Sequence, residues 1–160
     1  MPSVRVLIVE DFAPFQQFIS SALKKSPNLQ VIGVVSDGLE AVQKAEELQP
    51  ELILLDIGLP TLDGIEAARR IRKLSPESKL LFLSQESSAD VVQEVLHSGA
   101  LGYVAKRRAG IDLLAAVEAI CQGMRFVSPG LLGGVPVGLG DRQASNCLQP
   151  YFASQPETGD

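Results

Sequence analysis

The sequence predicts an α/β domain in which a doubly wound, five-stranded parallel sheet is covered by five helices. Three observations support this fold: short apolar runs alternate with amphipathic runs, Gly and Pro residues separate them, and the alternation is regular. Strands that alternate with helices pair in parallel through right-handed crossovers. With 160 residues, of which 46% are hydrophobic, the chain is long enough for one domain with a hydrophobic core.

The three strands of the first half differ in the strength of their patterns. Residues 4–9 are rich in β-branched side chains, and residues 30–35 form a second such run after the helix breaker Pro27. Residues 51–57 show the clearest pattern, because LILL continues without a polar residue into Asp56. A strand that is apolar on both faces is usually central, so we place this strand in the middle of the sheet.

Helices connect these strands to one another and to the two strands that follow. Between the strands, apolar residues recur at the i, i+3 and i+4 spacing of a helix with one buried side. Pro50 ends the second helix, and Gly99 closes the fourth. The fourth and fifth strands are predicted at residues 79–84 and 102–105, and the helices at residues 12–25, 36–48, 65–74, 89–98 and 111–122.

Composition and charge argue against several classes of protein. A net charge of -5 disfavours direct contact with nucleic acid, because phosphate backbones bind clustered Lys and Arg. Cys121 and Cys147 make neither a disulfide framework nor a metal-ligand spacing, so we expect a reducing, cytoplasmic location. The apolar run of residues 4–9 is too short for a signal peptide or a membrane span, and we expect no membrane partner.

The pattern changes after Ser128. Residues 129–160 combine closely spaced Gly and Pro with a polar end, and Arg142 is their only basic residue. We expect residues 1–128 to form the domain and residues 129–160 to form a linker-like or disordered tail. The apolar residues that begin with Leu131 could still pack on the domain.

Polar side chains stand where four of the five predicted strands end. Glu10 and Asp11 follow the first strand, Asp56 follows the third, Ser84 ends the fourth, and Lys106 follows the fifth. Because the carboxyl ends of parallel strands lie at one edge of a sheet, and ligands of such sheets bind there, we expect these side chains to converge.

Three carboxylates at one edge need a cation, because each close pair repels by about 4 kcal/mol at an effective dielectric near 20. Hard oxygen ligands suit Mg²⁺, and with their charge neutralised Asp56 can act as a nucleophile that forms an acyl phosphate. Lys106 can contact a phosphoryl oxygen, and the Ser84 hydroxyl can donate to another. Asp11 is also placed to cap the first helix.

These residues resemble the motif of CheY-like receiver domains, which belong to bacterial two-component response regulators. Glu10 and Asp11 resemble the acidic pair of that family, and Asp56 in LILLDIGLPTLDG resembles its phospho-accepting aspartate. Ser84 matches the switch Ser/Thr, and Lys106 matches the family's lysine. The resemblance covers roughly residues 3–128.

The resemblance implies a flavodoxin-like fold with strand order 2-1-3-4-5. It implies that Tyr103 is the switch aromatic and that Tyr103 and Ser84 move inward around the phosphoryl group, so that the fourth helix and fifth strand present a new surface. It also implies a sensor histidine kinase or phosphotransfer protein as donor, and a homodimer or a downstream protein as output. The implied Mg²⁺ ligands are Glu10, Asp11, Asp56 and the backbone carbonyl of Gly58.

Within the family, the segments SDGLEAVQKAEELQPELILLDIGLPTLDG and GMRFVSPGLL resemble receivers that precede a LuxR/NarL-type helix-turn-helix domain. No basic helical segment follows here, so the chain is either a stand-alone receiver or one whose effector domain has been lost or removed. Gln85 replaces the small residue that the family usually has beside the pocket. Arg107 and Arg108 replace the residues that commonly follow Lys106, and we expect both to be solvated, the alternative being contact with the acidic surface of a partner.

Two other functions compete with a phospho-accepting switch. Haloacid-dehalogenase phosphatases also form acyl phosphates, but they carry Asp-x-Asp after the first strand, whereas Ile57 and Gly58 follow Asp56 here. A phosphorylation-independent interaction module would not need the acidic pair, the serine and the lysine. We therefore expect a response regulator receiver that is not an enzyme.

Overall fold

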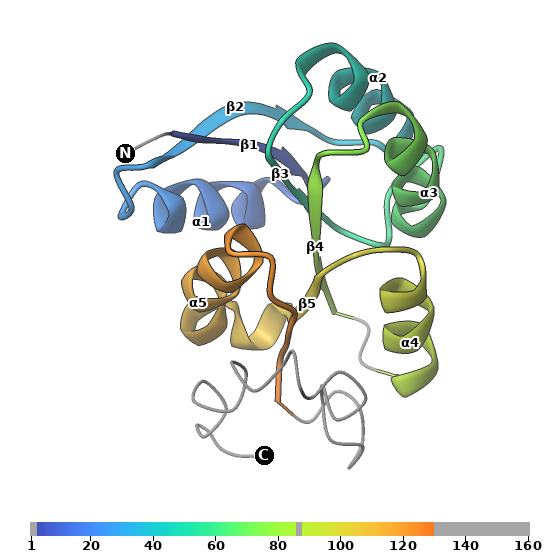
Figure 1. Cartoon of the computed structure of the whole chain (residues 1–160). Helices are drawn as coiled ribbons and strands as arrows, with labels where there is room; N and C mark the ends of the chain where they lie inside the picture. The colour runs from blue at the N-terminus through green and yellow to red at the C-terminus, as the bar shows by residue number, and fades with distance from the viewer. Residues whose placement is uncertain (1–2, 86–87, 130–160) are drawn as a thin grey trace.

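The computed structural model describes residues 3–85 and 88–129. Six strands of this part form one parallel sheet in the order β2-β1-β3-β4-β5-β6 (Figure 1). The strands are β1 (Val4–Val9), β2 (Leu29–Val35), β3 (Leu52–Leu55), β4 (Lys79–Ser84), β5 (Gly102–Ala105) and β6 (Phe126–Val127). The helices are α1 (Ala13–Leu23), α2 (Gly38–Leu48), α3 (Gly64–Leu74), α4 (Ala89–His97) and α5 (Ala109–Cys121), with a 3-10 turn η1 (Lys106–Arg108) before α5.

The predicted flavodoxin-like sheet of order 2-1-3-4-5 and its five helices are confirmed. The sixth strand was not predicted. It pairs Phe126 and Val127 with Gly102 and Tyr103 of β5. Two residues are too few for an alternating pattern, so only the return of the chain after α5 to the edge of the sheet reveals this strand.

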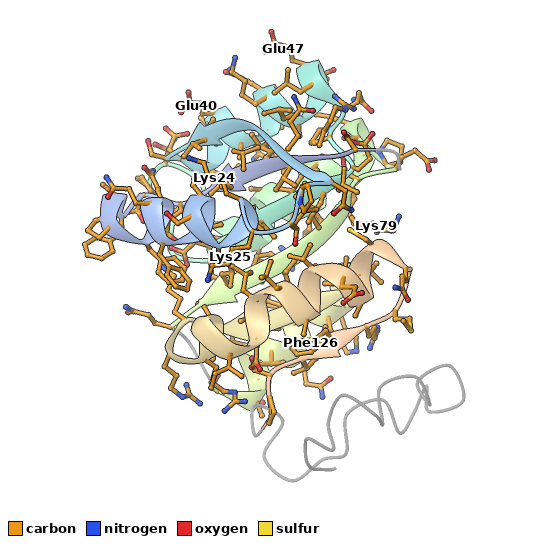
Figure 2. All side chains as sticks on the ribbon, turned by 90° about the vertical axis from the view of Figure 1, so that its left-hand side faces the viewer. Lys24, Lys25, Glu40, Glu47, Lys79 and Phe126 are labelled. Carbon is orange, nitrogen blue, oxygen red and sulfur yellow. The ribbon has the colours of Figure 1, made fainter. Side chains whose placement is uncertain are left out.

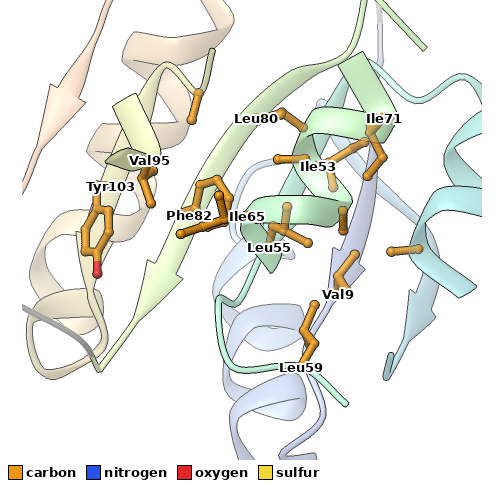
Figure 3. Packing of buried hydrophobic residues seen from close by; sticks show 14 of the residues in the cluster. Val9, Ile53, Leu55, Leu59, Ile65, Ile71, Leu80, Phe82, Val95 and Tyr103 are labelled. Carbon is orange, nitrogen blue, oxygen red and sulfur yellow. The ribbon is translucent and has the colours of Figure 1, made fainter. Parts of the chain in front are cut away.

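The sheet separates two apolar layers. Helices α2, α3 and α4 cover one face, and α1 and α5 lie side by side on the other (Figures 1 and 2). All four residues of β3 are buried, with Leu52 and Leu54 facing α1 and α5 and with Ile53 and Leu55 facing the other helices. The prediction of a central strand that is apolar on both faces is confirmed. Figure 3 shows the layer that contains Ile53, Leu55 and Tyr103.

Side-chain caps begin three of the helices. Asp37, Asp63 and Ser88 accept a hydrogen bond from the peptide N–H three residues ahead, at 2.7, 3.0 and 3.3 Å. Helix α1 starts differently, because Phe12 holds its N-cap position and makes no side-chain cap hydrogen bond. The prediction that Asp11 caps this helix is therefore wrong, which leaves its carboxylate free for the site described below.

The predicted tail lies almost entirely outside the described residues, which end at residue 129. Among the helices of the described part, none has both the length and the apolar composition that crossing a membrane requires.

Candidate functional site

The carboxyl edge of the sheet holds a pocket of about 580 Å³, and the side chains predicted to converge line it. Glu10 follows β1, Asp56 follows β3, Ser84 ends β4 and Lys106 begins η1 directly after β5. Asp11 and Gly58 line the same pocket. The crossovers of the fold thus bring together residues that are far apart in the chain.

Three carboxylates form an acidic cluster in this pocket. One oxygen each of Glu10, Asp11 and Asp56 lies within 4.8 Å of the others, and Glu10 and Asp56 are buried whereas Asp11 is exposed. The peptide N–H of Phe12 donates to Glu10 Oε2 at 3.1 Å. Glu10 Oε1 has no hydrogen-bond partner among the described residues. Three hard oxygen donors this close together fit a small divalent cation such as Mg²⁺.

Lys106 supplies the positive charge of the pocket. Its Nζ lies 2.9 Å from Glu10 Oε1 and 3.5 Å from Asp56 Oδ2, and its side chain is 13% exposed. The contact with Glu10 is an ion pair without the direction of a hydrogen bond. On another side, Nζ lies 4.7 Å from the centre of the Phe15 ring.

Burial sets the electrostatic state of the two inner carboxylates. Loss of water raises the pKa of Glu10 above its ordinary value, and the charge of Asp56 raises it further, whereas Lys106 lowers it. Burial likewise raises the pKa of Asp56, against the attraction of Lys106. One lysine therefore does not compensate the cluster fully, and a bound cation would favour the ionised carboxylates.

Gly64 allows the loop after Asp56 to close tightly. The peptide N–H of Asp56 donates to the carbonyl of Val9 at 3.1 Å, and that of Gly64 donates to the carbonyl of Ile57 at 2.7 Å. A Cβ atom on Gly64 would lie 2.0 Å from the carbonyl oxygen of Asp56. Only glycine therefore lets α3 begin against the backbone of Asp56.

The other predicted residues occupy different positions. Ser84 is buried and lines the pocket, and Gln85 is exposed at its rim. Tyr103 is fully buried in the layer under α2, α3 and α4 and does not line the pocket (Figure 3). Gly58 is exposed, and a metal-binding role of its carbonyl stays a prediction.

The structure reveals two features that the sequence interpretation missed. One is the contact of Phe15 with Lys106. The other is a buried carboxylate, Asp112, which accepts hydrogen bonds from Arg108 Nε at 2.9 Å and from Ser128 Oγ at 2.8 Å. Arg108, which we expected to be solvated, therefore keeps only 33% of its side chain exposed and is paired as well. Its i, i+4 spacing to Asp112 on the same helical segment was a usable signal.

Comparisons with known proteins agree with this geometry. The family described as response regulator receiver domain matches residues 6–118. The transcriptional regulatory protein DegU of Brevibacillus brevis is 32% identical over 126 residues, which make up 79% of this chain and 53% of that protein. A protein-glutamate methylesterase/protein-glutamine glutaminase of Thermotoga maritima is 38% identical over 111 residues, 69% of this chain and 32% of that protein.

A crystal structure of a LuxR-family two-component response regulator from Aurantimonas sp. SI85-9A1 has a TM-score of 0.77 and 28% identity, and the match covers 81% of this chain and 92% of that one. The chain spans about half of DegU and about a third of the methylesterase. The matched region is therefore only part of each of these two relatives, and the rest of their sequences lies outside the match. Because the family match extends over more than half of the sequence, the chain belongs to the response regulator receiver domain family.

Proposed function

We propose that the chain is a phospho-accepting switch of two-component signalling, in which Asp56 receives a phosphoryl group in a Mg²⁺-dependent reaction. The observation that carries the proposal is the position of Lys106, whose ammonium lies between Glu10 and Asp56 at the edge where three carboxylates meet. A lysine poised in this way neutralises part of the acidic cluster and has its charge beside the acceptor oxygen. A purely structural ion pair would not need the two additional carboxylates.

The carboxylates of Glu10, Asp11 and Asp56 would hold the metal, with the carbonyl of Gly58 as a further predicted ligand. When bound, Mg²⁺ neutralises these carboxylates and the charge of the incoming phosphoryl oxygens. The remaining work belongs to the side chains. Glu10 is held by the peptide N–H of Phe12, so it presents Oε1 toward Lys106 and the pocket without needing to reorient.

The transfer forms one bond and breaks one. A carboxylate oxygen of Asp56 attacks the phosphorus atom, and the bond from phosphorus to the leaving atom of the donor breaks, with its electron pair going to the leaving atom. For a phosphohistidine donor that atom is an imidazole nitrogen. Lys106 would then contact a phosphoryl oxygen, and the Ser84 hydroxyl would donate a hydrogen bond to another.

The output of this reaction is a change in protein contacts. Ser84 and Tyr103 are buried here, at 4% and 0% exposure, so the inward movement that the resemblance implies would take place within the interior and would not start from solvent. The added charge biases a two-state element, and we place that element at α4 and β5, as the sequence predicts. The proposed partners are a sensor histidine kinase or phosphotransfer protein as donor, and a second copy or another protein as target.

Two features of the chain support a switch that acts without catalysis on other molecules. Ile57 and Gly58 follow Asp56, so no second aspartate stands where an aspartate-based phosphatase places its acid/base. The methylesterase relative contains about three times the length matched here, and its named activity belongs to that whole protein. We also propose that the switch works in the cytoplasm, because the two cysteines form no disulfide framework.

The test is a mass measurement. The protein is incubated with Mg²⁺ and a small phosphodonor, and we expect a gain of one phosphoryl group that is absent without Mg²⁺ and absent in Asp56→Asn. Asp63→Asn is the matched control. Asp63 caps α3, so the variant protein should still take up the phosphoryl group on Asp56. A wild-type protein that gains no mass, or a gain that persists in Asp56→Asn, would contradict the proposal and leave the phosphorylation-independent module as the better explanation.

A further inference from the structure

The ring of Phe15 stands against the charge of Lys106. Nζ lies 4.7 Å from the ring centroid, which is within the range of a cation–π attraction. Resting on the function proposed above, we propose that Phe15 is the positioning residue of Lys106, and that its ring keeps the ammonium at the acceptor site when the neighbouring carboxylates no longer attract it.

The carboxylates cannot hold Lys106 throughout the reaction. Nζ is now attracted by Glu10 at 2.9 Å and by Asp56 at 3.5 Å. Both belong to the set that fits Mg²⁺, and a divalent cation on their oxygens would offset their negative charge and with it the Coulomb attraction for the ammonium. An acyl phosphate on Asp56 would bring negative charge back, so the interval in which Lys106 needs another support is the one before the phosphoryl group arrives. A lysine held only by these two groups would gain freedom to swing toward water just before a phosphoryl oxygen needs it.

An aromatic ring keeps its attraction for the ammonium when the carboxylates bind a metal. The face of the Phe15 ring carries a partial negative charge that no metal ligation or phosphorylation removes, and it has no lone pair that would compete for Mg²⁺. Lys106 is 13% exposed, so the ring replaces water on one side of the ammonium. Cation–π attraction is stronger for cations that have lost part of their water.

Phe15 is itself fixed in place. It lies in the first turn of α1, where its peptide N–H donates to the carbonyl of Phe12 at 3.0 Å. Its half-buried ring packs on the apolar layer under α1 and α5, and it stacks on Phe18 with 5.3 Å between ring centroids. A ring held by a helix start and by a stacking neighbour can serve as a rigid support for the lysine.

The experiment separates positioning of Lys106 from general damage to the pocket. Phe15→Leu keeps an apolar side chain but removes the ring, and Phe15→Tyr keeps the ring. Phe18→Leu is the matched comparison, because it removes the neighbouring ring that stacks on Phe15 but leaves the ring that faces Lys106 in place. Two quantities are measured for each variant: the affinity for Mg²⁺ alone by calorimetry, and the affinity for beryllium fluoride, a phosphoryl analogue, in saturating Mg²⁺.

We expect Phe15→Leu to weaken beryllium fluoride binding about fivefold and to slow phosphorylation by a small donor to a similar extent. We expect its Mg²⁺ affinity to stay within about twofold of wild type, because Phe15 has no ligand atom for the metal. Phe15→Tyr should resemble wild type in both measurements, and Phe18→Leu should keep the Mg²⁺ affinity of wild type and lose less beryllium fluoride affinity than Phe15→Leu. In a Lys106→Met background, Phe15→Leu should have no further effect.

Three outcomes would overturn the inference. They are unchanged beryllium fluoride affinity in Phe15→Leu, an equal loss in Phe15→Tyr, and a parallel loss of Mg²⁺ affinity, which would assign Phe15 to general packing. Replacing Phe15 by fluorinated phenylalanines, which keep the shape but weaken the ring charge, should give a graded loss. If wild type itself takes up no phosphoryl group, the proposed function fails; if wild type is phosphorylated and Phe15→Leu equals it, only this inference fails.

Discussion

Lys106 Nζ lies 2.9 Å from Glu10 Oε1, closer than the 3.5 Å that separates it from Asp56 Oδ2. The lysine that the sequence assigns to the phosphoryl group is thus paired with a carboxylate that the sequence assigns to the metal. The pair offsets part of the cost of burying two ions, but it also occupies the oxygen that a cation would use. Lys106 and a bound Mg²⁺ would therefore compete for Glu10.

Replacing Lys106 by methionine should strengthen Mg²⁺ binding, although it should impair phosphorylation. The variant lacks the ammonium that repels the metal and pairs with Glu10. We therefore expect its Mg²⁺ affinity to rise about threefold to tenfold. Calorimetric titration at mildly alkaline pH, where the carboxylates are ionised, measures this effect. Lys79→Met is the control, because Lys79 begins β4 at the opposite edge of the sheet (Figure 2). Equal affinity in the two variants would show that Lys106 and the metal do not compete.

Neutralising Asp56 should stabilise the protein when metal is removed. Its pKa is raised by burial, so the folded protein takes up the proton more readily than the unfolded chain does. This contribution to stability is present in full below the ordinary pKa of an aspartate and is lost as the pH rises through the raised value. At neutral pH with EDTA, Asp56→Asn should therefore unfold at a higher temperature than wild type, by about 1 kcal/mol in free energy.

The same prediction has a pH signature. As the pH falls and Asp56 becomes protonated in the folded protein, the advantage of Asp56→Asn should disappear. Thermal unfolding followed by circular dichroism across the acidic range measures it, with the exposed Asp90→Asn as control. An advantage that is independent of pH would attribute the effect to packing and not to charge.

Adding one methyl group at Gly64 should disrupt the pocket. The new Cβ atom would lie 2.0 Å from the carbonyl oxygen of Asp56, so the loop or α3 must move. We expect Gly64→Ala to cost about 2–4 kcal/mol of unfolding free energy and to weaken Mg²⁺ binding. Gly110→Ala is the matched control, because nothing lies within 4 Å of its added Cβ, and it should be neutral or stabilising. Urea unfolding of both variants decides the point.

Removing the buried carboxylate of Asp112 should destabilise the protein more than removing an exposed acid from the first turn of a helix. Asp112→Ala would leave Arg108 and Ser128 Oγ without this acceptor, and we expect a loss of about 2–3 kcal/mol. Asp90, the first-turn acid of α4, is exposed, so Asp90→Ala should cost well under half as much. Urea unfolding compares them. Similar losses would show that the network around Asp112 contributes little.

Ser128 links this network to the strand that leads into the site. Its peptide N–H donates to the carbonyl of Tyr103 at 2.9 Å, and its Oγ accepts from the peptide N–H of Ala105 at 3.2 Å while donating to Asp112. The last described residues are therefore attached to β5 immediately before Lys106. Strand β6, which holds Ser128 in this place, is also the element that the sequence did not predict.

The sequence by itself determined the order of the elements and the edge of the sheet at which the polar residues gather. LILL is apolar at every position, so β3 had to be covered on both faces, and Asp56 at its end had to emerge at the carboxyl edge. The same logic places Glu10 after β1 and Lys106 after β5, because parallel strands end at a common edge.

Only the tertiary structure decided which of these groups touch. The pairing of Lys106 with Glu10, the ring of Phe15 beside its ammonium and the hydrogen bond from Ser128 to Asp112 depend on distances between elements, which the packing of α1 and α5 on the sheet sets. Periodicity reports which face of an element is buried, but it carries no information on which side chains of two packed elements meet. That physical limit separates the acidic edge, which could be predicted, from the partners of Lys106, which could not.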